Sequence, residues 1–213
     1  MNKLHVIADQ NYNWPIDLAK FKNMELNFVM AGESCSPLYW LDKVFDIDYK
    51  KGDKVIGLIP SAERDTKFKD VNNELPNIDR TVHLTAIDPG IHQNVDRIQF
   101  ISSVVVKALH EFSKDKDAYF YLFQDQIYNH NDGYHLITDL KKYPSINFVE
   151  ELDPRTIGGG IGLAPMTVWL AKYNNIPLDK VPLSATRKTY TDEAGRSLFT
   201  TAILKTLPET FFY

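Results

Sequence analysis

The chain has 213 residues, enough for one large domain whose apolar core forms without disulfides or metal ions. Its single cysteine, Cys35, excludes an intramolecular disulfide and favours a cytoplasmic protein over a secreted one. A net charge of −4 argues against a large phosphate-binding surface. The start lacks the apolar stretch of a signal peptide, and no apolar run approaches the roughly 20 residues of a membrane span, so we expect a soluble protein.

The first third of the chain alternates strand-like and helix-like segments. Short apolar runs bounded by turn residues predict strands over 4–8, 26–31 and 54–59. Apolar residues at helical spacing predict short helices over 15–23 and 38–45. Pro15 suits the first position of its helix, where its missing N–H is not needed.

The middle of the chain contains the longest predicted elements. Residues 61–79 are polar and are expected to form a surface excursion. Polar and apolar residues alternate along the strand predicted over 80–87, and a long amphipathic helix is predicted over 94–112. The six residues 118–123 are all apolar, which is typical of a strand buried on both faces of a parallel sheet.

The remaining segments continue the alternation. Helices are predicted over 134–143, 166–173 and 196–206, and strands over 146–149 and 181–185. The whole pattern predicts an α/β fold, with a doubly wound, mainly parallel Rossmann-like sheet and helices on both of its faces.

We divide the chain into two predicted parts. Residues 1–175 form a Rossmann-like amino-terminal domain. Residues 176–213 form the start of a second, incomplete domain or a carboxy-terminal βα extension.

Asp125 is the first candidate for catalysis. It follows the predicted buried strand 118–123, and the carboxyl ends of parallel strands open into the ligand crevice of such sheets. A carboxylate at that place is suited to proton transfer. The alternative interpretation is a loop aspartate that caps a turn or the following helix.

A glycine-rich turn at 158–162 is the second candidate. Glycines such as Gly159 and Gly160 let a backbone approach a phosphate closely, and an apolar helix follows soon after. The spacing fits neither the dinucleotide fingerprint nor the lysine-containing phosphate loop, so a hinge or helix-entry turn stays an alternative.

Basic residues near the end of the chain form the third candidate. Arg187 and Lys188 follow the predicted strand 181–185, and Arg196 begins the last predicted helix. Guanidinium groups and backbone N–H groups at such a junction can converge on a diphosphate. The alternative is a solvated basic loop.

Nucleophilic and metal sites receive less support. The turn before Cys35 lacks the second glycine of a nucleophile elbow, and no adjacent basic residue lowers the thiol pKa. The histidines show no pairing on one helix face, so a structural zinc site is not predicted.

Two segments together resemble a known family. The run Asn77-Ile78-Asp79-Arg80-Thr81-Val82 is followed by a long helix and by Tyr119-Phe120-Tyr121-Leu122-Phe123-Gln124-Asp125. This order resembles the amino-terminal domain of the bacteriophage DNA beta-glucosyltransferases, which have the two-domain glycosyltransferase B architecture. The resemblance implies that Asp125 is the general base for a hydroxymethylated DNA base. It also implies that Arg187 and Arg196 hold the diphosphate of a sugar nucleotide.

The expected function is therefore transfer of a sugar from a sugar nucleotide to an acceptor hydroxyl, with a modified DNA base as one candidate acceptor. A divalent metal ion, Mg²⁺ or Mn²⁺, is a candidate cofactor. The sequence ends one strand and one helix into the family's donor-binding domain, so a complementary chain is a further expected partner. Two alternatives remain: a nucleotide- or nucleoside-binding hydrolase, and a noncatalytic partner or decoy that keeps the fold.

Overall fold

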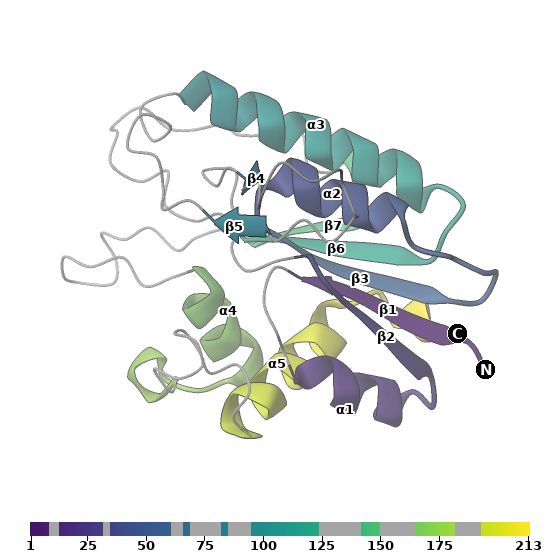
Figure 1. Cartoon of the computed structure of the whole chain (residues 1–213). Coiled ribbons are helices and arrows are strands. Elements are labelled where there is room, and N and C mark those ends of the chain that lie inside the picture. Colours follow the sequence, from purple (N-terminus) through teal and green to yellow (C-terminus); the bar gives the residue numbers. More distant parts are fainter. Residues whose placement is uncertain are drawn as a thin grey trace.

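The protein is an α/β structure built on one parallel sheet of five strands (Figure 1). The computed structural model describes residues 1–8, 13–31, 35–60, 66–68, 82–84, 95–123, 142–149, 165–181 and 193–213. The strands of the sheet are β1 (Lys3–Ala8), β2 (Glu25–Met30), β3 (Lys54–Ile59), β6 (Ala118–Phe123) and β7 (Ile146–Val149). Their order across the sheet is β2-β1-β3-β6-β7. The predicted α/β class is thus confirmed.

Helices cover both faces of this sheet (Figure 1). One face carries α1 (Trp14–Phe21), α4 (Pro165–Asn174) and α5 (Glu193–Thr206). The other face carries α2 (Pro37–Phe45) and α3 (Val95–Ser113). Two short 3₁₀ helices, η3 (Leu178–Lys180) and η5 (Glu209–Phe212), follow α4 and α5 in the chain.

Two apolar clusters hold these layers together, one on each face of the sheet. Along β1, Leu4 and Val6 belong to the cluster under α1 and α5, whereas Ile7 belongs to the cluster under α2 and α3. This division follows from the two-residue period of a strand. All six residues of β3 are buried, as expected for a central strand of a parallel sheet.

Local chemistry explains where α2 begins. Ser36 precedes the helix in an extended conformation, and its hydroxyl accepts a hydrogen bond from the backbone N–H of Tyr39 at 3.3 Å. Pro37 occupies the first helical position, where no N–H donor is required. A serine cap followed by proline therefore fixes the start of the helix one residue before the predicted one.

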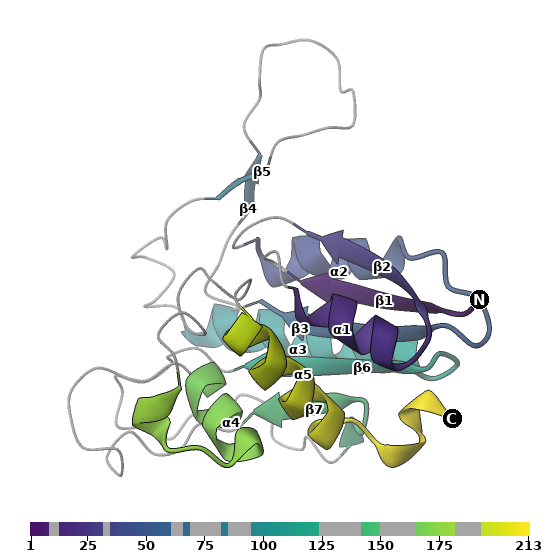
Figure 2. The same cartoon turned by 90° about the horizontal axis from the view of Figure 1, so that it is seen from below.

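The described part of the segment predicted as a strand over 80–87 belongs to a second sheet. This part is β5 (Val82–Leu84), which pairs antiparallel with β4 (Thr66–Phe68) in a separate two-stranded sheet (Figure 2). Polar and apolar residues alternate in this segment, whereas the central strands of the main sheet are almost entirely apolar. That alternation is typical of strands with one solvated face, which explains the pairing away from the buried sheet.

The carboxy-terminal segment packs onto the main body of the protein. Phe199, Ile203 and Phe211 lie in the same apolar cluster as Leu4 of the first strand. Of the predicted strand 181–185, only Val181 is described, directly after η3. The predicted helix 134–143 lies almost wholly outside the described residues, and the division after residue 175 stays a prediction. Among the described helices, none is both long and apolar enough to cross a membrane.

Candidate functional site

The carboxyl edge of the sheet is where open parallel sheets bind their ligands. All five strands are parallel, so their carboxyl ends lie along one edge. β1 pairs with β2 on one side and with β3 on the other. The helices that follow β1 and β2 therefore leave this edge toward opposite faces, α1 to one and α2 to the other (Figure 1).

A carboxylate and a guanidinium meet between α1 and α5. Asp17 lies in the first turn of α1, and Arg196 is the fourth residue of α5. The Nε and Nη2 groups of Arg196 donate to the two carboxylate oxygens of Asp17, which makes the ion pair bidentate. Each side chain is about one third exposed, at 33% for Asp17 and 32% for Arg196.

An aromatic contact fixes the two helices beside this pair. Trp14 at the start of α1 is stacked on Phe199 of α5, with ring centroids 6.4 Å apart and planes 10° from parallel. Both rings are completely buried. The buried stack therefore holds the two backbones in register for the ion pair above it.

The pairing changes the electrostatics of Asp17. The hydrogen bond from Arg196 lowers the pKa of Asp17 and outweighs partial burial, which raises it. The charges of Arg196 and Lys20 lower this pKa further. Asp17 is consequently a carboxylate at neutral pH, and the positive charge of Arg196 is compensated.

This geometry bears on the predicted diphosphate site. Arg196 is predicted to face a diphosphate, and in the structure its guanidinium is paired with Asp17. A phosphate at this place would have to compete with a bidentate carboxylate for the same donors. The other predicted site residues, Asp125, Arg187, Lys188, Gly159 and Gly160, lie outside the described residues.

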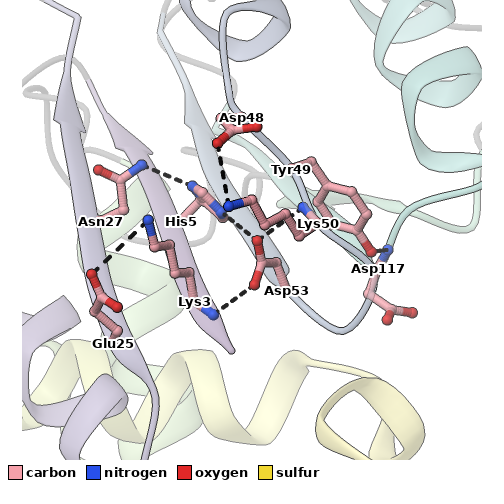
Figure 3. Close-up of polar contacts among 9 residues, drawn as sticks. All are labelled: Lys3, His5, Glu25, Asn27, Asp48, Tyr49, Lys50, Asp53 and Asp117. Atoms are coloured by element: carbon pink, nitrogen blue, oxygen red, sulfur yellow. Dashed lines mark hydrogen bonds and ion pairs between the residues drawn. The ribbon is translucent and has the colours of Figure 1, made fainter. Parts of the chain in front are cut away.

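A second polar constellation lies at the opposite, amino edge of the sheet (Figure 3). The imidazole of His5 on β1 is 1% exposed and lies between Asp53 and Asn27. His5 Nε2 is 3.1 Å from Asp53 Oδ2, and Asn27 Nδ2 is 2.8 Å from His5 Nδ1. A neutral imidazole satisfies both contacts, with Nε2–H donating to Asp53 and Nδ1 accepting from Asn27.

Asp53 is the centre of this network. Its Oδ1 accepts the backbone N–H of Lys3 at 2.7 Å, and its Oδ2 also accepts the backbone N–H of Lys50 at 3.0 Å. Burial raises the pKa of Asp53, but the hydrogen bonds from Lys3, His5 and Lys50 outweigh burial and lower it. The carboxylate thus joins the starts of β1 and β3, while Asn27 attaches β2 (Figure 3).

The amino-edge network is structural in character. Every partner of Asp53 comes from the strands or turns that it fastens, and the group is 3% exposed. Sequence reasoning did not single out these residues. The available signal was one polar residue, His5 or Asn27, in each of the otherwise apolar runs 4–8 and 26–31.

The remaining candidates give no catalytic group. Cys35 is completely buried in the cluster beneath α2, so its thiol is shielded from substrate. Within the described ranges, no three His, Cys, Asp or Glu residues gather in a way that could hold a metal ion. A surface hollow of about 460 Å³ beside α4 and η3 is lined mainly by apolar residues, and it has one charged lining residue, Lys172.

Comparisons with known proteins found no similar protein. No protein-family model, curated protein or solved structure matches this chain. The proposed function therefore depends on the arrangement of the sheet and on the sequence resemblance described above.

Proposed function

We propose that this protein binds a sugar nucleotide at the carboxyl edge of its sheet and transfers the sugar to an acceptor hydroxyl. The observation that carries the proposal is the strand order β2-β1-β3-β6-β7 in an all-parallel sheet. Counted within this sheet alone, the order corresponds to 2-1-3-4-5, and ligands of open parallel sheets with that order bind outside the carboxyl ends of the strands where the order reverses. Here the reversal falls between β1 and β3.

Asp125 is the proposed general base. It follows Phe123, the last residue of β6, by two positions in the sequence, and β6 pairs with β3 next to the reversal point. In the proposed step the Asp125 carboxylate takes the proton of the acceptor hydroxyl, and the acceptor oxygen attacks the anomeric carbon. The bond between that carbon and the diphosphate oxygen breaks, and the diphosphate leaves with the bonding electrons.

Positive charge near the leaving diphosphate is the second requirement of the reaction. Arg187 and Lys188 are proposed to supply it, together with backbone N–H groups at Gly159 and Gly160. Mg²⁺ or Mn²⁺ would stabilise the same oxygens if bound. Arg196 has a changed role in this proposal, because it is already paired with Asp17. It positions α1 against α5 unless a ligand displaces the carboxylate.

The test of the base is transfer activity in the Asp125→Asn variant. We expect the variant to fold and to bind the donor, but to lose transfer by about a hundredfold or more, because a general base contributes roughly that factor. Asp115→Asn is the matched control. Asp115 is 77% exposed beside Lys116 and precedes the amino end of β6. The Asp115→Asn variant should therefore transfer the sugar as fast as the unmodified chain.

Calorimetry against a panel of sugar nucleotides tests donor binding separately. The proposed site is supported if one sugar nucleotide gives heat of binding and if this heat is smaller in the Arg187→Ala variant. Release of free nucleotide without any acceptor would favour a hydrolase instead. Absence of heat with every donor would favour a noncatalytic protein, with or without a complementary chain or DNA as partner. Full transfer by Asp125→Asn would remove that residue from the mechanism.

A further inference from the structure

Among the strands that the structure describes, β2 is an edge strand and is open on one side. It pairs with β1 on one side, and no described strand pairs with it on the other (Figure 2). Its four central residues are only half-buried and its two end residues are exposed, whereas all of β3 and most of β1 are buried. Met30 at its carboxyl end is 55% exposed.

The direction of the backbone groups follows from the pairing with β1. The N–H of Glu25 donates to the carbonyl of Asn2, and the N–H of Ala31 donates to the carbonyl of Ala8. Alternate residues of a parallel strand point their N–H and C=O groups to the same neighbour. The odd-numbered residues therefore face β1, and Leu26, Phe28 and Met30 point their amide groups away from it.

The open side lacks the features that usually prevent strand pairing. β2 contains no proline and no lysine, and its only charged residue, Glu25, stands at its amino end. The Glu25 carboxylate lies 4.0 Å from the Lys3 ammonium of the neighbouring strand. An exposed apolar edge without such protection is a template for pairing with another strand.

The three residues of β2 whose amide groups point away from β1 form an outward row, and this row can pair with a second copy of itself. Leu26, Phe28 and Met30 are apolar, equally spaced and symmetric in type about Phe28. In an antiparallel pair centred on Phe28, the two Phe28 residues face each other and each Leu26 faces Met30 of the other copy. The same register places Glu25 opposite Ala31, so no like charges oppose one another.

We propose that a second copy of this chain docks on β2 through its own β2, antiparallel and with Phe28 at the twofold axis. The three outward residues of each copy then exchange their N–H and C=O groups, giving six hydrogen bonds between the chains. The two five-stranded sheets become one continuous sheet. The Leu26 and Phe28 side chains, which pack against the cluster under α1, continue that apolar layer across the axis.

The first test is the mass of the full-length protein by sedimentation equilibrium over a range of concentrations. We expect a reversible dimer. Met30→Pro should weaken it by about tenfold or more, because proline removes an outward N–H donor but no hydrogen bond to β1. Met30→Leu is the matched control and should dimerise like the unmodified chain. Met30→Lys, which keeps the N–H but charges the row, provides a second disrupting variant if the proline variant fails to fold.

Hydrogen exchange tests the register. The amides of Leu26, Phe28 and Met30 should become protected as the concentration rises, whereas those of Asn27 and Val29 should be protected at every concentration. A monomer at all concentrations would overturn the proposal. So would a dimer that survives both Met30→Pro and Met30→Lys, or concentration-dependent protection that falls on another element.

Discussion

Asp53, at the amino edge of the sheet, has several hydrogen-bond partners within the protein. Asp53 accepts hydrogen bonds from two backbone N–H groups and from His5 while almost fully buried. A buried donor that loses its acceptor costs more free energy than the hydrogen bond contributes when made. A one-atom change at Asp53 should therefore lower the stability of the fold measurably.

Replacing Asp53 by asparagine tests this expectation. The amide keeps one acceptor oxygen, so at least one of the Lys3, Lys50 and His5 donors loses its partner. We expect the free energy of unfolding to fall by about 1–3 kcal/mol at neutral pH, measured by urea denaturation. Asp48→Asn makes the same chemical change at a side chain that is 84% exposed, and it should cost less than about 0.5 kcal/mol.

The effect of this substitution should depend on pH. The pKa of Asp53 is lowered in the folded protein, so the folded state binds fewer protons than the unfolded state in the acidic range. The stabilisation by Asp53 is then complete above the ordinary carboxyl pKa of about 3.9 and is lost as the pH falls through the folded pKa. The difference between Asp53→Asn and the unmodified chain should shrink there. An equal difference at neutral and strongly acidic pH would contradict the assignment.

At the scale of the element, β3 depends on a residue without a side chain. A Cβ atom at Gly57 would lie 2.5 Å from Phe120 Cδ1 and 2.8 Å from Trp40 Cζ2. The two rings meet edge to face over this position, with centroids 6.1 Å apart. Glycine therefore leaves the space over β3 that the rings of Trp40 from α2 and Phe120 from β6 occupy.

Gly57→Ala should destabilise the fold by about 1–3 kcal/mol, because an extra methyl group overpacks a closed core. Thermal unfolding followed by circular dichroism measures the change. Combining it with Phe120→Leu, which removes ring atoms from the crowded place, should give less destabilisation than the sum of the two single variants. Strict additivity would show that the methyl group finds room without moving the ring.

At the scale of the whole molecule, the last helix completes the core on one face. Tyr121 of β6 lies under α5, and its hydroxyl is 2.8 Å from Thr206 Oγ1. Burial raises the pKa of the Tyr121 phenol, which stays protonated. Phe199, Ile203 and Leu207 each contribute about 1.5–3 kcal/mol by their burial. Their joint loss approaches the roughly 5–15 kcal/mol that stabilises an ordinary domain.

A chain that ends at residue 175 should therefore lose cooperative thermal unfolding. A chain that ends at residue 208 is the control, because it keeps α5 and loses only η5, with Phe211 as the buried side chain. We expect the control to unfold cooperatively at a lower temperature. A sharp transition in the shorter chain, near that of the full chain, would show that residues 1–175 fold as a domain of their own.

The residue pattern alone predicted the central strands and two of the helices. The bounds of β3, β6 and β7 agree with the predicted 54–59, 118–123 and 146–149, because short and mainly apolar runs bounded by turn residues are typical of the strands of a parallel sheet. Helix periodicity likewise located α2 and α3 to within a residue or so. These signals are local, so they survive in the sequence without knowledge of the fold.

The contacts between polar groups, by contrast, could be read only from the folded chain. Asp17 and Arg196 lie 179 positions apart in the chain, and Asp53 reaches His5 across 48. No local pattern records which helices become neighbours, because that depends on the order of strands in the sheet. For the same reason, the residues around Arg196 do not predict its pairing with Asp17.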